Sequence, residues 1–274
     1  MLNRHYGNYV FITGGSSGIG RSIAELLAEN GYIVFSASRN PSPDTKVYPS
    51  GGEIRPVTMD IRNAKSVAQA AEHVTSEADI GIVIHCAGIG IACPAESFPS
   101  NAVKDLMDTN FTGVLLVNSA FIPRLRERGS GLCIIIGSVG GIFPIPFQSH
   151  YCASKAALDI YSAALRMELS DFNVQVSLVL PGDTNTGFTN ARSYEIDKSS
   201  PYYDKCISAV QKMEKDELGG RPPESVAKVV LKICKRKKAP GRVTIGFSYK
   251  LLVFLHRLLP AKLIERLLKS IYMK

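Results

Sequence analysis

Residues 9–20 read YVFITGGSSGIG, an apolar strand-forming run that leads into a glycine-rich turn. A helical spacing of apolar residues begins directly afterwards, at Ile23, Leu26 and Leu27. Glycines in such a turn let a pyrophosphate approach the backbone, where free N–H groups and the positive end of the helix meet its charge. A glycine turn alone is also compatible with an ordinary loop. Its place after a strand favours a dinucleotide site, and we expect contacts from Gly14, Ser16, Ser17, Gly18, Ile19 and Gly20.

The rest of the chain repeats this alternation of short apolar runs and longer amphipathic stretches, which is typical of a parallel sheet with helices on both faces. We expect strands at residues 9–13, 32–37, 54–58, 81–86, 132–137, 174–180 and 243–246. We expect helices at residues 18–30, 63–77, 101–127, 151–171 and 223–236. The predicted fold class is therefore α/β, with one doubly wound Rossmann-type domain over residues 1–248 and a parallel sheet of seven strands.

Two connections differ from the regular pattern. Residues 40–53 hold three prolines and two glycines, so we expect a turn-rich crossover with little helix. Residues 181–222 form a long break rich in Pro, Gly, Asp, Asn and Ser. Loops of this length in compact domains are usually functional or disordered, and we expect a substrate lid at residues 183–221.

The composition excludes several classes of protein. The chain has 274 residues, of which 45% are hydrophobic and 20% charged, as in a soluble globular protein and unlike a disordered, collagen-like or polytopic membrane chain. Its six cysteines show no zinc-site spacing, so we expect reduced thiols and no metal. The first residues hold no apolar signal core of about 7–15 residues, which argues against secretion. We expect a cytoplasmic protein.

The residues after the second and third strands indicate which dinucleotide binds. Ser38 and Arg39 stand where an acidic residue would bind the ribose hydroxyls of NAD. A guanidinium there can clamp a 2′-phosphate, so we expect NADP(H); the alternative is a solvent-facing arginine. Asp60, which closes the third strand beside Ile61, can accept a hydrogen bond from the adenine amino group.

Tyr151 and Lys155 are four residues apart in a helical stretch, so both side chains emerge on one face. A phenol titrates near pH 10, and a neighbouring ammonium together with the positive nicotinamide ring favours its phenolate, which would bring it into the range of an acid–base catalyst. Ser138, at the end of a strand, can donate a hydrogen bond to a substrate oxygen. The alternative for a tyrosine and a lysine at this spacing is an ordinary surface pair.

Taken together, Thr13-Gly14 with Gly18 and Gly20, Ser138, and Tyr151-Cys152-Ala153-Ser154-Lys155 resemble the short-chain dehydrogenase/reductase family over about residues 7–246. The resemblance implies that Tyr151 is the acid–base group, that Lys155 lowers its pKa and holds the ribose, and that Ser138 polarises the carbonyl. It implies a water relay sustained by Asn110. Further cofactor contacts are implied at Ala87, Gly88, Pro181, Gly182, Thr184 and Thr186.

One motif departs from that family. The family usually has Asn-Asn-Ala-Gly after the fourth strand, whereas this chain has His85-Cys86-Ala87-Gly88. The missing amide puts the local stabilisation of the sheet in question more than the reaction. We expect His85 to be a buried, hydrogen-bonded structural residue and not a metal ligand.

The segments expected beside the nicotinamide are apolar, namely residues 88–94, 140–147 and much of 183–221. The motifs around Ser138 and Tyr151 look most like the 17β-hydroxysteroid and retinol dehydrogenase branch. That likeness implies interconversion of a hydrophobic ketone and alcohol of the steroid, retinoid or long-chain lipid type. One alternative is a 3-ketoacyl or 3-ketosphingoid lipid reductase, such as one acting on 3-ketodihydrosphingosine. Another is a non-catalytic NADP-sensing regulator.

The end of the chain is strongly basic. Residues 228–274 carry a net charge of +12, whereas residues 1–227 carry −4. Residues 249–274 combine these cations with an apolar helical face, so we expect an amphipathic extension. It either rests on a membrane surface, at its cytoplasmic face, or packs against the domain or a second subunit. We expect no nucleic acid partner, and the family resemblance implies a homo-oligomer.

Overall fold

The computed structural model describes residues 4–194 and 196–273, and within them eight strands form one sheet in the order β10-β8-β7-β5-β1-β2-β4-β3. All neighbours pair in parallel except β3, which is antiparallel to β4. The strands are β1 Tyr9–Thr13, β2 Ile33–Ser38, β3 Lys46–Val47, β4 Glu53–Thr58, β5 Ile82–His85, β7 Gly131–Ile136, β8 Val174–Leu180 and β10 Arg242–Thr244. A small second sheet pairs β6 (Ile91–Ala92) with β9 (Ser193–Tyr194).

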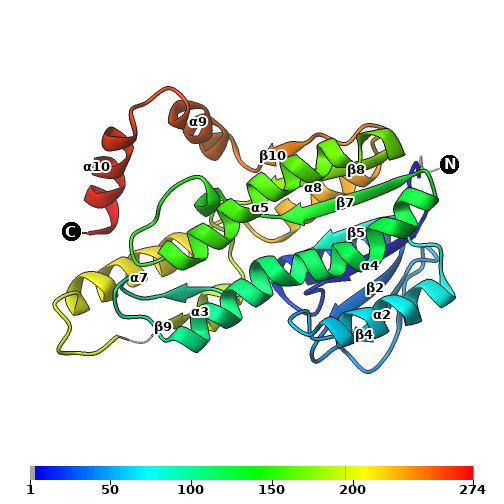
Figure 1. Ribbon diagram of the computed structural model, residues 1–274, viewed down its shortest axis with the longest axis horizontal. Helices are drawn as coiled ribbons and strands as arrows, with labels where there is room; N and C mark the ends of the chain where they lie inside the picture. Colours follow the sequence, from blue (N-terminus) through cyan, green and yellow to red (C-terminus); the bar gives the residue numbers. More distant parts are fainter. Residues whose placement is uncertain (1–3, 195, 274) are drawn as a thin grey trace.

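Helices cover both faces of the sheet, as Figure 1 shows. One apolar core packs the sheet against α2 (Ala64–Glu77), α4 (Gly113–Glu127) and α5 (Ser149–Glu168). The other packs it against α1 (Gly18–Glu29) and α8 (Glu224–Cys234). Alternation along β1 divides its side chains between them, because Phe11 belongs to the first core and Val10 and Ile12 to the second. The predicted α/β fold with a doubly covered sheet is confirmed.

The sheet differs from the prediction at one edge. The seven expected strands are present, and an eighth, β3, forms inside residues 40–53. Its two residues fold back on β4, where Lys46 pairs with Ile54 and Val47 with Glu53. So short a strand gives too weak an alternation to be recognised from sequence.

Two helical segments also differ from the prediction. The single helix expected over 101–127 is α3 (Ser100–Met107) and α4 joined by a π-helical segment, Asp108–Thr112. The long break at 181–222 contains a helix of 16 residues, α7 (Tyr203–Leu218), and a short one, α6 (Phe188–Ala191). Two short 3₁₀ turns lie elsewhere in the chain, at Val139–Gly141 after β7 and at Ser170–Phe172 after α5.

The tail forms two helices, α9 (Phe247–His256) and α10 (Ala261–Tyr272). In Figure 1 the strand arrows point toward the side of the molecule where α7, α9 and α10 lie. Ile264 of α10 is buried, whereas Leu263, Leu267 and Ile271 are exposed. The predicted amphipathic helix is confirmed. Among the described residues, no helix combines the length and the apolar character needed to cross a membrane.

Candidate active site

The glycine turn after β1 lies directly against the carboxyl end of β5. The Thr13 hydroxyl oxygen accepts hydrogen bonds from the backbone N–H groups of Cys86 and Ala87, both at 3.2 Å. Gly14 has a φ of +69°, and a Cβ on it would come within 2.7 Å of the Ala87 Cα. A Cβ on Gly20 would come within 2.1 Å of the Gly14 carbonyl oxygen. Both glycines are therefore required for the close approach of turn, helix and sheet.

The first turn of α1 is open toward ligands. Its N-cap, Ser17, has an extended backbone, and within the described chain its side chain caps none of the first N–H groups. Ser17, Gly18 and Ile19 line a cavity of about 340 Å³ at the carboxyl ends of β1, β5, β7 and β8. A helix N-terminus that opens into a cavity offers unpaired donors and a positive dipole end to an anion.

The same cavity holds the three predicted reactive side chains, Ser138, Tyr151 and Lys155. The Lys155 Nζ lies 5.8 Å from the Tyr151 ring centroid and donates a hydrogen bond to the Ile136 carbonyl oxygen at 3.3 Å. The Ser138 Oγ accepts a hydrogen bond from the Gly140 N–H at 3.0 Å, which leaves its own hydrogen free to donate. The i, i+4 spacing on α5 therefore brings the phenol and the amine to one cavity.

Burial is the main influence on the pKa of the Tyr151 phenol. Burial raises this pKa to about 12, while the nearby Ser138 hydroxyl, which could donate to a phenolate, opposes the rise. Burial also lowers the pKa of Lys155 to about 8, and the nearby Cys86 thiol opposes that change. The protein's own groups thus hold Tyr151 protonated at neutral pH, because loss of water outweighs the nearby hydroxyl and neighbouring charges.

Asn110, in the π-helical segment, lies behind the cavity and not in its wall. It is fully buried, its Oδ1 accepts from the Ile89 N–H at 2.8 Å, and its Nδ2 donates to the Ile89 carbonyl oxygen at 3.0 Å. The Nδ2 also donates to the Ser154 hydroxyl at 3.1 Å. A Cβ on Gly88 would lie 3.4 Å from the Asn110 Oδ1 and 3.5 Å from the Lys155 Nζ. Asn110 therefore ties the loop after β5 to α5 beside Lys155.

His85 is buried at the end of β5, and its predicted structural role is confirmed. Its Nε2 lies 2.8 Å from the Asn118 Oδ1, and the Asn118 Nδ2 donates to the Tyr161 hydroxyl at 3.0 Å. Burial lowers the pKa of His85 to about 4, so the ring is neutral and donates from Nε2. This network links β5 to α4 and α5.

Comparison with known proteins gives the family. The model of the short chain dehydrogenase family matches residues 8–197. The chain belongs to the short-chain dehydrogenases. Two curated relatives of this family member are a 3-ketodihydrosphingosine reductase from Bacteroides thetaiotaomicron and a human 17-beta-hydroxysteroid dehydrogenase type 1.

The bacterial reductase is 38% identical over 240 residues, which cover 86% of this short-chain dehydrogenase and 87% of the relative. The human enzyme is 35% identical over 189 residues, 65% of this chain and 57% of its own length. A solved short chain dehydrogenase from Burkholderia cenocepacia in complex with NADP superposes with a TM-score of 0.75 at 25% identity, over 96% of this chain and 98% of that one. The likeness to the hydroxysteroid and retinol dehydrogenase branch is thus confirmed.

Short-chain dehydrogenases use a nicotinamide dinucleotide, and the residues of this chain fit one. The glycine cradle and the open end of α1 suit the pyrophosphate. At the end of β2, the buried Ser38 Oγ has no hydrogen-bond partner among the residues that the structure describes. The next residue, Arg39, is exposed. A buried hydroxyl without a described partner and an exposed guanidinium are donors that fit the adenosine end of such a cofactor.

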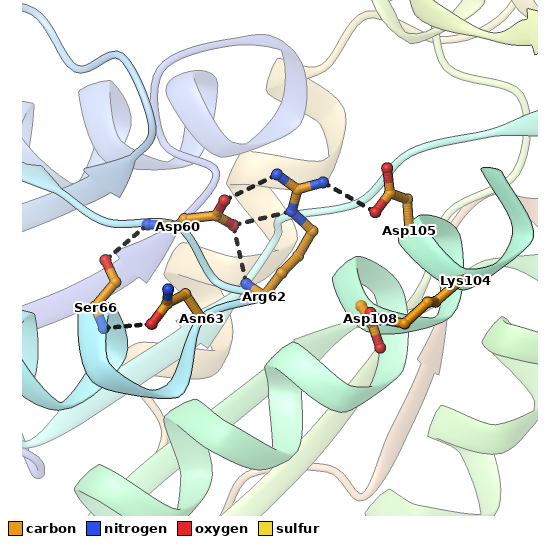
Figure 2. Close-up of polar contacts among 7 residues, drawn as sticks. All are labelled: Asp60, Arg62, Asn63, Ser66, Lys104, Asp105 and Asp108. Carbon is orange, nitrogen blue, oxygen red and sulfur yellow. Dashed lines mark hydrogen bonds and ion pairs between the residues drawn. The ribbon is translucent and has the colours of Figure 1, made fainter. Parts of the chain in front are cut away.

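Asp60 is held by a neighbouring arginine, as Figure 2 shows. The Arg62 Nε and Nη2 donate to its two carboxylate oxygens at 3.1 and 2.9 Å, and the Arg62 Nη1 lies 3.1 Å from Asp105. The hydrogen bond from Arg62 is the main cause that lowers the pKa of Asp60. A carboxylate oxygen can accept more than one hydrogen bond, and the Asp60 Oδ2 accepts one, so it has capacity for a further donor such as an adenine amino group.

The predicted cofactor contacts fall into two groups. Those that line the cavity are Gly14, Ser17, Gly18, Ile19, Gly20, Ala87, Gly88, Tyr151, Lys155, Pro181, Gly182, Thr184 and Thr186. Those that lie outside its wall are Ser16, Ser38, Arg39, Asp60 and Ile61. Ile61 is buried in the first core, where Gly113 of α4 approaches it closely.

Sequence reasoning missed several side chains of the cavity wall, among them Asp183, Phe188 and Glu217. The Phe188 ring centroid lies 5.8 Å from that of Tyr151. Glu217 of α7 accepts a hydrogen bond from Thr189 at 2.6 Å and forms an ion pair with the buried Arg192. The helical spacing of Cys206, Ala209, Val210 and Met213 was a signal for α7 that the polar composition of the segment obscured.

Proposed function

We propose that this protein is an NADP(H)-dependent reductase of hydrophobic ketones and that its substrate is a long-chain 3-keto sphingoid base. The observation that carries the proposal is the meeting of Ser138, Tyr151 and Lys155 in one cavity beside the glycine turn. A non-catalytic NADP sensor would not need these three groups together. Bound NADPH would supply the hydride.

The choice of NADP(H) over NAD(H) rests on the end of β2. Arg39 and the Ser38 hydroxyl stand there, where a carboxylate would repel a 2′-phosphate. A charge-assisted hydrogen bond from a guanidinium favours the phosphorylated coenzyme. Lys155 and the first turn of α1 would hold the ribose and the pyrophosphate.

The side chains of the cavity suit proton donation to a ketone. The free hydrogen of the Ser138 hydroxyl would polarise the substrate oxygen, and the Tyr151 hydroxyl would give it the proton. Because burial raises the pKa of Tyr151 to about 12, the protonated form that ketone reduction requires prevails at neutral pH. Oxidation of an alcohol would use the phenolate instead.

The substrate class rests on one carboxylate and one relative. Asp183 lines the cavity, and a sphingoid base carries an ammonium group beside its ketone that a carboxylate would pair with. Glu217, the other acid of the wall, is already neutralised by an ion pair with Arg192, whereas the Asp183 carboxylate is hydrogen-bonded only to a neutral group, the Tyr249 hydroxyl, among the described residues. The relative named as a 3-ketodihydrosphingosine reductase supports this class. Neutral ketones of the steroid or retinoid type are the second candidate, supported by the apolar wall residues Ile145 and Phe188.

The tail supports a peripheral membrane location. Leu263 and Leu267 of α10 are exposed, as is Leu258 before it, and Lys262, Arg266 and Lys269 lie between and beside the two leucines along α10. An apolar surface flanked by cations fits an anionic lipid interface. The six cysteines of the described chain are free thiols, which supports the cytoplasmic face of that membrane.

A homo-oligomer is supported by the outer surface of α5. Ile160 and Met167 are 75% and 71% exposed, which is unusual for two large apolar residues of one helix. Light scattering would measure the oligomer mass of the wild type and of Ile160→Glu, and we expect a smaller mass for the variant. Equal masses would remove α5 from the interface.

The reaction is tested with purified protein, NADPH and a panel of sphingoid, steroid and retinoid ketones. We expect NADPH oxidation with the 3-keto sphingoid base and a loss of at least about a hundredfold in kcat for Tyr151→Phe. NADPH affinity should stay unchanged in that variant. Normal turnover by Tyr151→Phe, or tight NADPH binding with no ketone reduced by the wild type, would overturn the proposal.

A further inference from the structure

A second and larger cavity lies beside the catalytic one, under the last helix. Its volume is about 640 Å³, within the range of about 300–1,000 Å³ typical of small-molecule sites. Hydrocarbon forms most of its wall, contributed by Pro94, Pro144, Pro146, Phe147, Leu268 and Met273. The charged residues that also line it, Glu96, Glu265 and Lys269, are exposed and therefore lie at its mouth.

Ile145 separates the two cavities and lines both. A Cβ on Gly140 would lie 3.6 Å from the Ile145 Cδ1, 3.4 Å from the Tyr151 Cε1 and 3.3 Å from the Ser138 Oγ. The Ile145 side chain, the Ser138 hydroxyl and the Tyr151 ring therefore surround the same point beside Gly140. Cys152, the residue after Tyr151, lines the second cavity. The second cavity therefore begins one side chain away from the position of the reacting carbonyl.

The wall of this cavity is well packed. Phe147 is buried with a φ of +62°, a conformation that is strained for a residue with a side chain. Its carbonyl oxygen accepts a hydrogen bond from the Cys93 N–H at 2.9 Å, and its ring meets that of Tyr202 with centroids 6.4 Å apart. Met273 packs on the same apolar cluster, so the end of α10 closes the cavity from outside.

We infer that this cavity binds the hydrocarbon chain of the ketone substrate, which passes Ile145 and lies under α10. The inference rests on the proposed function and adds where the two ends of the substrate go. The short polar end faces Asp183 in the catalytic cavity. The long apolar end is buried away from water, beneath Leu268 and Met273. Selectivity for long chains then arises from the tail helix, not from the residues that carry the reaction.

The first test is a homologous series of 2-amino-3-ketones of increasing chain length. Each methylene that enters the cavity should raise kcat/KM about fourfold until the cavity is filled. Once it is filled, further carbons should add nothing. If the ketones are reduced with a kcat/KM independent of chain length, the chain subsite is overturned while the proposed function stands.

The second test measures binding without turnover and uses the absence of tryptophan from the sequence. Leu268→Trp puts an indole in the cavity wall, whereas Leu267→Trp puts one on the exposed face of the same helix. A saturated long-chain amino alcohol should shift the emission of Leu268→Trp to shorter wavelength and leave that of Leu267→Trp unchanged. Equal responses of both variants would place the chain elsewhere.

The same pair of variants separates chain binding from catalysis. The indole fills part of the cavity, so Leu268→Trp should lose at least about tenfold in kcat/KM for the longest ketone and keep its rate with the shortest. Leu267→Trp should match the wild type with both. A loss of both activities by Leu268→Trp, with unchanged thermal unfolding, would assign Leu268 to the reaction site and overturn the inference. Failure of the proposed function would appear differently, as no reduction of any ketone by the wild type.

Discussion

Tyr249 of α9 donates its hydroxyl hydrogen to the carboxylate of Asp183 in the catalytic cavity. Its ring lies against Gly182, where a Cβ would come within 2.1 Å of the Tyr249 Cε2, so only glycine permits this contact. Burial and the Asp183 carboxylate together raise the pKa of Tyr249, which keeps its hydroxyl a donor. The first helix of the tail therefore orients the one carboxylate proposed to meet the substrate's amine.

Asp183→Asn should discriminate against a cationic substrate. It removes the negative charge and keeps the shape, so KM for a 2-amino-3-ketone should rise about 10- to 100-fold. KM for a neutral ketone of equal length should be unchanged. Steady-state kinetics with the two ketones measures both. An equal loss with both substrates would mean that Asp183 acts on the fold or the cofactor and not on the amine.

The rate of ketone reduction should fall above about pH 8. Burial lowers the pKa of Lys155 to about 8, and a lysine is a cation below its pKa, so the ammonium beside the cofactor site is lost as pH rises through that value. Tyr151 stays protonated until about pH 12 and should not contribute to this fall. A kcat/KM profile measured against pH at saturating NADPH checks the direction. A level profile well above pH 8 would separate the charge of Lys155 from activity.

Arg39→Asp should exchange the cofactor preference. A carboxylate at the end of β2 would repel the 2′-phosphate, so NADPH affinity should fall about 10- to 100-fold while NADH affinity rises. Isothermal titration with both coenzymes measures the exchange. Arg21→Asp is a matched control, since Arg21 is an exposed arginine of α1 paired with Glu25. The assignment fails if the wild-type protein binds the two coenzymes equally.

His85 should make the protein sensitive to mild acid. Its pKa is lowered from 6.5 to about 4 by burial, so the unfolded chain takes up a proton that the folded chain refuses. Stability is therefore complete above about pH 6.5 and falls as pH decreases toward 4, by about 2 kcal/mol between pH 7 and pH 5. His85→Asn should abolish this dependence, as seen in urea unfolding at the two pH values. An unchanged slope in the variant would assign the acid sensitivity to other groups.

The exposed face of α10 should bind anionic vesicles. Replacing Leu263 and Leu267 together by Asp removes apolar contact and adds repulsion, so co-sedimentation with phosphatidylglycerol vesicles should be lost. Val47→Asp, at an exposed apolar residue of β3, is the control and should bind like the wild type. Binding should weaken with salt and with neutral phosphatidylcholine. Retained binding by the double variant would assign α10 to protein packing alone.

The sequence predicted the elements whose signals are local. The glycine turn, the strand before it and the i, i+4 pair of Tyr151 and Lys155 each lie within a few residues, so spacing alone places them. The residues proposed for the adenosine end are also marked locally, because Ser38 ends β2 and Asp60 follows β4, the neighbouring strand. These residues make up the part of the candidate site that short-range sequence patterns predict.

The rest of the site depends on contacts between distant segments. Tyr249 and Asp183 are 66 residues apart, and their contact follows from the path of the chain after β10, which no local pattern records. The π-helical turn around Asn110 arises from tertiary hydrogen bonds to Ile89 and Ser154. The raised pKa of Tyr151 has the same origin, since burial exceeds the effect of the neighbouring polar groups. Burial is a property of the assembled fold.

The edge strands of the main sheet affect how copies of the chain can aggregate. One edge strand is β3, which has two exposed residues including Lys46. The other edge strand is β10, which has three residues. Such short edge strands expose few unpaired N–H and C=O groups, and the charge of Lys46 disfavours pairing with an edge strand of another copy. Edge-to-edge stacking of this sheet into fibrils is therefore disfavoured.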